Sequence, residues 1–254
     1  MLGKSSNPVL QKDTFNSTYF TDTQSGVMTI KGTINKTFLM LLLVVLGASF
    51  TWKLFFDAAD PAVGSSKVMG WMIGGGIGGF IMSLVIIFKK SWVAYTAPIY
   101  SILEGLFLGA ISAFFNVMYP GIVIQAVSLT FGTLFALLFA YKSGLIKVTE
   151  RFKLGVIAAT GGIAIFYFIS FIISMFGVNM SIVWGNGLFS ISLSVFIVII
   201  AALNLVLDFD FIQKGAESGA PKYMEWYGAF SLMVTLIWLY IEFLRLLSKI
   251  SSRD

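Results

Sequence analysis

The sequence predicts an all-α integral membrane protein in which seven transmembrane helices form one bundle. Of its 254 residues, 57% are hydrophobic and only 11% are charged, whereas soluble domains carry about 25% charged residues. So few charged side chains could not cover a water-facing surface. Seven continuous apolar stretches are long enough to cross a bilayer, which takes roughly 20 residues in a helix. None alternates with the period of two that a transmembrane β-strand shows.

The predicted spans follow one another through short connections. Asn-Val-Met-Tyr-Pro-Gly links the third span to the fourth, and Gly-Val-Asn-Met-Ser links the fifth to the sixth, so sequential helices should be antiparallel neighbours. No boundary indicates a second domain, and residues 37–247 form the membrane domain. Its predicted spans are residues 37–56, 68–88, 92–116, 121–141, 154–176, 183–207 and 226–247.

The two ends of the chain lie outside the predicted spans. Residues 1–26 are rich in Ser, Thr and Asn and have no apolar core, so they are neither a signal peptide nor a span. We expect residues 1–36 to be a flexible polar tail that ends in a short interfacial lead-in over residues 27–36. Residues 248–254 form a short C-terminal tail.

The composition excludes most enzyme chemistry. Without cysteine, the chain can form no disulfide, thiolate nucleophile, iron–sulfur cluster or thiolate zinc site. Without histidine, it can form no histidine-ligated zinc or haem and no serine–histidine catalytic pair. We therefore expect no enzyme, no catalytic residue, no cofactor and no resident metal. The net charge of +5 is spread between apolar runs, which indicates membrane orientation and not a nucleic-acid partner.

Basic residues predict the orientation of the spans. The N-terminal tail and the even-numbered connections hold twelve lysines and arginines, whereas the other side holds four, with Lys53 near its edge as a fifth. Because cytoplasmic segments carry the excess of basic residues, we expect an inner-membrane protein with a cytoplasmic N-terminus. The basic C-terminal tail fits poorly with an outside end. Either its charges are tolerated there, or the last segment does not cross fully.

The second span contains a glycine-rich run, Gly-Gly-Gly-Ile-Gly-Gly, over residues 74–79. It lacks the Lys-Ser/Thr pair and the preceding strand of a phosphate-binding loop. Gly70, Gly74 and Gly78 recur every four residues, the small-residue spacing that lets transmembrane helices approach closely. We expect these three glycines to form a helix-packing face.

Four acids lie inside the spans or at their margins, where a charge costs at least ~2.5–3.5 kcal/mol. Glu104 lies in the middle of the third span, with no basic residue on that helix. It is either part of an ion path or a protonated structural acid that bonds to a neighbouring helix. Glu242 has Arg245 three residues ahead, and the alternative to a functional role is an interfacial ion pair.

Asp208 and Asp210 are predicted to end the sixth span. Residues two apart on a helix point about 200° from each other, so at most one of these acids faces the bundle centre. Asp208 continues a polar stripe from Asn204, and Asp210 has Lys214 four residues ahead, the spacing of a helical ion pair. The alternative to a functional role is an interfacial helix end with one solvated pair.

Several motifs occur in order along nearly the whole chain. They are Ser-Asn-Pro-Val-Leu at residues 6–10, Met-Thr-Ile-Lys-Gly at 28–32, Leu-Glu-Gly-Leu-Phe-Leu-Gly at 103–109 and Leu-Asp-Phe-Asp-Phe-Ile-Gln at 207–213. Each motif alone is loose. In this order across seven spans, the chain resembles the Bax inhibitor-1 family of membrane proteins, in its bacterial branch.

The resemblance implies a bundle with the last helix at its centre and a passive, pH-sensitive calcium leak. In the family, an aspartate late in the sixth helix faces an aspartate in the seventh, and their shared proton is thought to latch the closed pore. Asp210 fits the first aspartate, with Asp208 as the alternative. An alignment on residues 229–232 places Thr235 at the second position, whereas an alignment on residues 239–243 places Glu242 there. With Thr235 in that place, its hydroxyl would donate one hydrogen bond to Asp210.

Two functions remain open from the sequence. The first is a leak channel or slow transporter for calcium or protons with Glu104, Asp210 and Glu242 along its path, where calcium would find its six to eight oxygen ligands only transiently. The second is a non-conducting regulator that binds another membrane protein, such as a membrane-embedded protease. An intramembrane aspartyl protease would need a Gly-x-Gly-Asp motif and a retinal protein a lysine inside the last span, and the sequence has neither.

Overall fold

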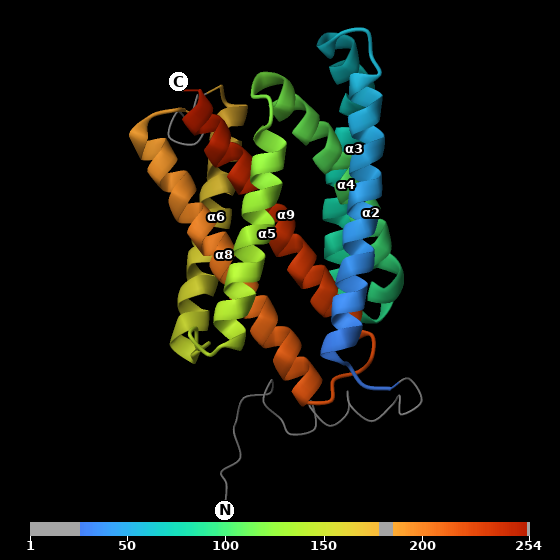
Figure 1. Ribbon diagram of the computed structural model, residues 1–254, viewed down its shortest axis with the longest axis vertical. Coiled ribbons are helices and arrows are strands. Elements are labelled where there is room, and N and C mark those ends of the chain that lie inside the picture. The colour runs from blue at the N-terminus through green and yellow to red at the C-terminus, as the bar shows by residue number, and fades with distance from the viewer. Residues whose placement is uncertain (1–25, 178–184, 253–254) are drawn as a thin grey trace, which may run out of the picture.

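The computed structural model describes residues 26–177 and 185–252. Within them, seven helices are long and apolar enough to cross a membrane, which confirms the predicted all-α, seven-span protein. The predicted flexible tail lies mostly in residues 1–25, outside the described part. The helices in Figure 1 are α2 (Ile30–Phe56), α3 (Pro61–Phe88), α4 (Val93–Met118), α5 (Ile122–Lys142), α6 (Glu150–Met175), α8 (Leu188–Glu217) and α9 (Met224–Ser251).

Several helices extend beyond the predicted spans, and in two of them local signals explain where the helix ends. α2 begins at Ile30, since the Thr29 side chain caps it by accepting a hydrogen bond of 2.9 Å from the Gly32 amide. The predicted lead-in at residues 27–36 is therefore mostly helix. α8 continues past residue 207 to Glu217 and ends before Gly219, whose φ of 68° suits glycine. The acids at 208 and 210 consequently lie inside a helix and not at its end.

α9 occupies the centre of the bundle, as the resemblance implied. It is the most buried of the seven spans and packs against α2, α4, α5 and α8. In Figure 1 it runs diagonally behind α5 and α2. Most of its side chains therefore meet protein instead of lipid, so its polar residues can find partners on neighbouring helices.

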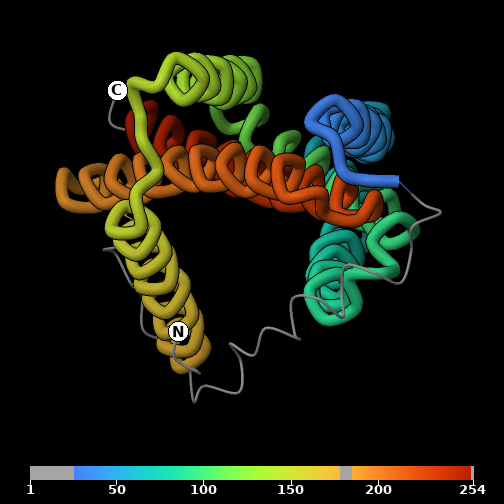
Figure 2. Tube along the Cα trace, turned by 90° about the horizontal axis from the view of Figure 1, so that it is seen from below, coloured from blue at the N-terminus to red at the C-terminus, as the bar shows by residue number. Residues whose placement is uncertain are grey.

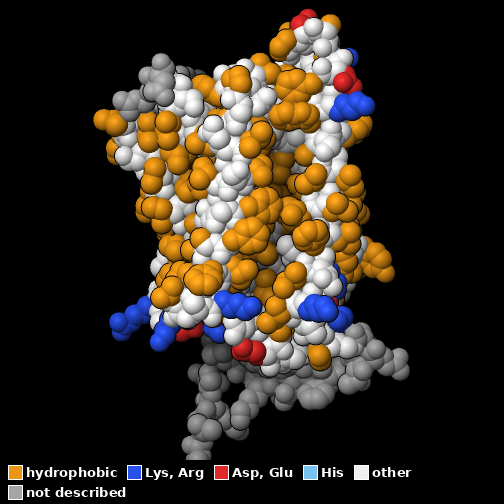
Figure 3. Space-filling view, in the orientation of Figure 1, with side chains coloured by type: hydrophobic (Ala, Val, Ile, Leu, Met, Phe, Trp, Pro, Cys, Tyr) orange, Lys and Arg blue, Asp and Glu red, His pale blue; other side chains and the backbone are white. Residues whose placement is uncertain are grey.

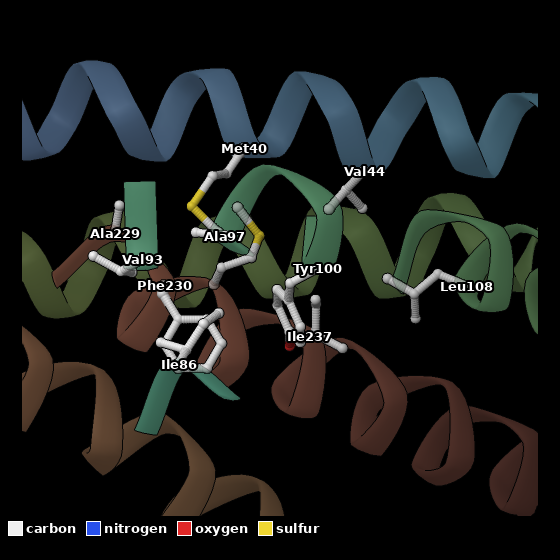
Figure 4. Close-up of a cluster of buried hydrophobic side chains, with 11 residues drawn as sticks. Met40, Val44, Ile86, Val93, Ala97, Tyr100, Leu108, Ala229, Phe230 and Ile237 are labelled. Atoms are coloured by element: carbon white, nitrogen blue, oxygen red, sulfur yellow. The ribbon is translucent and has the colours of Figure 1, made fainter. Parts of the chain in front are cut away.

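One cluster of buried side chains joins α9 to the first helices (Figure 4). Tyr100 of α4 packs edge-on against Phe230 of α9, with ring centroids 5.0 Å apart, and Met40 and Val44 approach from α2. Lipid tails are as apolar as these side chains, so close packing and not removal of water holds the helices together. The cluster thereby fixes α9 against α2 and α4.

α3 packs closely against α4 through two inward-facing glycines. A Cβ atom at Gly75 would lie 2.6 Å from the carbonyl oxygen of Leu103 on α4, and a Cβ at Gly79 would lie 2.6 Å from Oε1 of Glu104. Both distances are too short for a real Cβ contact. At Gly75 the neighbour is backbone and cannot move aside, so glycine is required there, whereas at Gly79 the Glu104 side chain would have to shift.

The glycines of α3 that approach α4 most closely are Gly75 and Gly79, and not the three that the spacing predicted. Gly70 and Gly74 have no atom within 4 Å of the position that a Cβ would take, and Gly78 meets only the Leu103 side chain. The helix is rotated by one residue from the predicted orientation, so that the next glycine along, Gly75, faces α4. A regular four-residue spacing was present on both faces of this glycine-rich helix, and spacing alone could not choose between them.

The bundle has one chemically distinct end. Lysine and arginine side chains gather at the lower end in Figure 3, where α2 begins and α8 ends. We call this the basic end and the other the far end. Described basic residues near helix ends on this side are Lys31, Lys36, Lys89, Lys90, Lys142, Lys147, Arg151, Lys153, Lys214 and Lys222.

α6 lies at the edge of the bundle. Its main contacts in the described structure are with α8. Seen from below in Figure 2, it stands apart from α3, and α8 lies between the two sides of the bundle. Several apolar side chains of α6 are consequently exposed, among them Phe168, Ile169 and Phe171.

Candidate functional site

Three acids of α8 and α9 lie in separate clusters. Asp208, Asp210 and Glu242 are at most 7% exposed, yet each has its own set of partners. Among the described residues, no three Asp or Glu side chains converge into a group that could hold a metal ion. The chemistry of each acid therefore depends on its immediate neighbours.

Asp208 joins α8 to the central helix α9. Its Oδ1 accepts a hydrogen bond of 2.5 Å from Ser231 Oγ, a length typical of a hydroxyl that donates to a carboxylate. Thr235 also lies beside this carboxyl group, and its hydroxyl donates to the Ser231 carbonyl oxygen at 3.3 Å. Asp208 Oδ2 is buried and has no hydrogen-bond partner among the described residues. We call Asp208, Ser231 and Thr235 the Asp208 cluster.

Asp210 faces α6 and forms ion pairs at the basic end. Its Oδ2 lies 2.8 Å from Lys214 Nζ, the pair that the sequence predicted, and 3.2 Å from Lys153 Nζ in the first turn of α6. In the described structure, no hydrogen bond joins Asp210 to Thr235 or to Glu242, so the predicted latch of Asp210 with Thr235 is absent there. Because residues two apart on a helix point in different directions, α9 meets the acid two positions earlier.

Glu242 forms a cluster with Arg245 and Tyr167 of α6. The Arg245 guanidinium lies 3.1 Å from Glu242 Oε1, which confirms the ion pair that the sequence predicted as the alternative to a functional role. Tyr167 donates its hydroxyl to the same oxygen at 3.0 Å, and Arg245 lies over the Tyr167 ring, 5.0 Å from its centroid. The negative charge of Glu242 is therefore compensated within one cluster.

Glu225 is a buried acid that the sequence reading missed. It is fully buried at the start of α9 and forms ion pairs with Lys36 of α2 and with Lys222, the latter at 2.9 Å. The amide and the hydroxyl of Thr29 also donate to it, at 2.9 and 2.8 Å. Met28 strengthens this link, because its amide donates to the carbonyl of the connection before α9 at 2.7 Å. Glu225 thus ties the start of α2 to the start of α9.

Lys249 is a second buried ionisable residue that the sequence reading did not single out. It lies near the far end of α9, is 5% exposed, and donates to Ser194 Oγ at 2.8 Å and to the Ser190 carbonyl at 3.3 Å. Both serines belong to the first turns of α8. The basic residues at this end of α9 are therefore partly structural, which explains how a basic C-terminal segment is accommodated.

Glu104 lies apart from the acids of α8 and α9. Its carboxyl group faces Gly79 of α3, and no hydrogen bond or ion pair joins it to another described residue. Tyr100, one turn earlier on α4, is its electrostatic neighbour. The structure therefore does not bring Glu104 together with the Asp208 cluster, and its role in an ion path stays a prediction.

The comparison with known families gives a match over nearly the whole chain. A family model described as Bax inhibitor 1 like matches residues 7–252. The chain belongs to the Bax inhibitor 1 like family. No curated protein and no solved structure matches the chain.

The Asp208 cluster is the candidate functional site of this Bax inhibitor 1 like protein. Asp210 has two lysine partners and Glu242 has an arginine, whereas no described lysine or arginine forms an ion pair with Asp208. One hydrogen bond holds its carboxyl group to α9, and that bond changes in strength when a carboxyl group gains or loses a proton. The carboxyl group of Asp208 therefore lies directly in the contact between α8 and the central helix.

Proposed function

We propose that this Bax inhibitor 1 like protein is a pH-sensitive cation leak channel or slow transporter that passes calcium. The observation that carries the proposal is Asp208, a buried acid on the contact of α8 with α9 that lacks a cationic partner among the described residues. Protonation alters both its charge and its hydrogen bond to Ser231. Because α9 packs against four helices, a shift of this contact reaches most of the bundle.

The surroundings of the acids favour a leak over storage of calcium. Calcium prefers six to eight oxygen ligands, and the described acids are held in separate clusters. An ion that passes them would keep part of its hydration shell and meet one carboxyl group at a time. Asp208 is the proposed gating residue, and Glu104, which has no hydrogen-bond partner among the described residues, is a proposed contact along the path.

We further propose that the basic end faces the cytoplasm and that the protein lies in the inner membrane of a bacterium. The concentration of lysine and arginine at one end of the bundle (Figure 3) supports this orientation. In that orientation, the ion pairs of Asp210 and Glu225 lie on the cytoplasmic side, and Lys249 lies near the outer side.

The competing function is a non-conducting regulator that binds another membrane protein, such as a membrane-embedded protease. The exposed apolar side chains of α6 favour this alternative, because α6 packs mainly against α8 among the described helices. Transmembrane helices associate by close packing, so the exposed side chains of α6 could pack against a helix of a partner.

Calcium influx into liposomes separates the two functions. Purified protein is reconstituted without any other protein, and entry of calcium is followed with an enclosed dye at several pH values. A leak channel gives influx above that of liposomes that carry an unrelated seven-helix protein, and the influx changes with pH. Influx equal to this control at every pH would reject conduction and leave the regulator.

A further inference from the structure

A cavity of about 340 Å³ opens on the membrane-facing side of the bundle. α2 and α5 form its two walls, and α4 and α9 form its floor. α2 and α5 are not among the helix pairs that pack closely, and Figure 3 shows a recess between them. The gap is therefore an entrance from the side, through the surface that faces lipid.

The lining of the cavity is poor in groups that could hold water. Most of it is aliphatic and aromatic side chains. Two of its hydroxyl groups, on Ser112 and Tyr240, bind each other at 2.6 Å, and the Thr130 hydroxyl donates to a carbonyl of its own helix at 2.8 Å. A buried water needs two to four polar partners. These three hydroxyls already have partners, and the one other hydroxyl of the lining, on Ser49, is too few to hold a water. The cavity therefore favours an apolar occupant.

The mouth of the cavity lies at hydrocarbon depth. Val45 and Val127 line opposite walls near the middle of α2 and in the first half of α5. The surface beside them is also apolar and exposed, with Leu46 on α2 and Leu129 on α5. Lipid tails are therefore the medium next to the opening. An empty apolar cavity forfeits the dispersion contacts of its walls, and an acyl chain can supply them.

The lining residues also indicate the leaflet. α2 runs from the basic end to the far end, and the cavity follows its second half up to Trp52. Lys53, the next residue, is exposed, and a lysine at this position suits the headgroup region of a membrane. The chain of a lipid that enters here would come from the leaflet at the far end.

We propose that this cavity binds one acyl chain of a phospholipid from the leaflet at the far end, with the chain resting on α9. The occupant would contact Tyr240, Leu236 and Met233 of the central helix. Lipid composition would thereby act on the same helix as the Asp208 cluster, from its other side. The proposal does not depend on conduction, since it concerns occupancy of the cavity alone.

Bromine quenching of Trp52 fluorescence tests the proposal. Trp52 lines the cavity, and the other five tryptophans are replaced by phenylalanine. The protein is reconstituted in vesicles of dioleoylphosphatidylcholine or of the same lipid with dibrominated chains. Val127→Phe and Val45→Phe fill the cavity from its two walls. Each should remove most of the quenching that the parent shows, because the filled cavity no longer admits a brominated chain.

Control variants distinguish filling of the cavity from a general effect of an added aromatic ring. Leu129→Phe and Leu46→Phe add the same ring to exposed positions of the same two helices outside the cavity, and should leave the quenching of Trp52 unchanged. In a second background, Trp71 on the exposed face of α3 is the only tryptophan, and its quenching should not respond to any of the four variants. Unchanged quenching of Trp52 in both filling variants, or an equal loss in the controls, would overturn the proposal. No quenching of Trp52 in the parent would also overturn it and indicate a protein occupant such as a second copy.

Discussion

Asp208, Asp210 and Glu242 are buried to a similar degree, but their partners give them different chemistry. Lysines neutralise Asp210, and an arginine with a tyrosine hydroxyl neutralises Glu242. Asp208 has one hydroxyl donor on one oxygen and no partner for the other among the described residues. A nearby cation favours the charged form of a carboxyl group, and Asp208 has no such cation among the described residues. This difference is the reason that we propose Asp208 as the gating residue.

The substitution Glu225→Gln tests whether this buried acid stabilises the fold. The substitution keeps the shape of the side chain but removes the charge that pairs with Lys36 and Lys222. We expect a loss of about 2–3 kcal/mol in stability, seen as a lower melting temperature of the purified protein in detergent. Glu217→Gln is the control, since Glu217 is exposed at the end of α8. Equal melting temperatures of the two variants would contradict the role assigned to Glu225.

At the scale of the helix, α3 shows how closely two helices can approach when glycines face the partner. The contact of α3 with α4 depends on which glycines of a glycine-rich run are turned inward. Gly75 faces the Leu103 backbone, whereas Gly74 faces open space. Gly74 and Gly75 are adjacent glycines of one helix, so the effects of the same substitution at the two positions can be compared directly.

Gly75→Ala and Gly74→Ala should have opposite outcomes. A methyl group at 75 would meet the carbonyl oxygen of Leu103, which is backbone and cannot move aside, so we expect a loss of about 1–3 kcal/mol. A methyl group at 74 meets nothing within 4 Å, and alanine favours a helix over glycine by about 0.8–1.0 kcal/mol. Melting temperatures of the two variants in detergent measure the difference. A larger loss for Gly74→Ala would mean that α3 is turned the other way.

At the scale of the whole molecule, the asymmetry of charge and the central α9 define the architecture. The basic end carries the ion pairs that join α2, α6 and α8 to their neighbours. The far end contains few charges, and its buried Lys249 is bonded to serines. Because cytoplasmic segments carry the excess of basic residues, this asymmetry of charge is the basis of the proposed orientation.

Single cysteines can test this orientation, because the natural chain contains none. Ala59→Cys lies in the exposed connection between α2 and α3 at the far end, and Ser218→Cys lies in the exposed connection between α8 and α9 at the basic end. In intact cells, a membrane-impermeant maleimide should label the cysteine at 59 and spare the one at 218. Both should react after the membrane is opened. Labelling of 218 alone in intact cells would reverse the orientation.

The sequence was sufficient to predict the seven helices, because a continuous apolar run of span length has few other structures available to it in a membrane. It also predicted the ion pairs Asp210–Lys214 and Glu242–Arg245, since both are local on one helix. Contacts between distant residues could not be read from spacing. Lys36 reaches Glu225 across 189 positions, and Lys153 reaches Asp210 from another helix. Whether Asp208 or Asp210 meets α9 depends on the rotation of α8 about its own axis. In a span that is hydrophobic on all sides, the apolar periodicity does not predict this rotation.

The central claim is that titration of Asp208 controls the contact between α8 and α9, and one measurement tests it directly. Calcium influx into liposomes is recorded against pH for the wild type and for Asp208→Asn, with Asp210→Asn as the matched control two residues away. An asparagine cannot titrate and resembles a protonated acid in charge. We predict that Asp208→Asn fixes influx at the level that the wild type reaches at its acidic limit, while Asp210→Asn still responds to pH. A pH profile of Asp208→Asn that matches the wild type would contradict the claim.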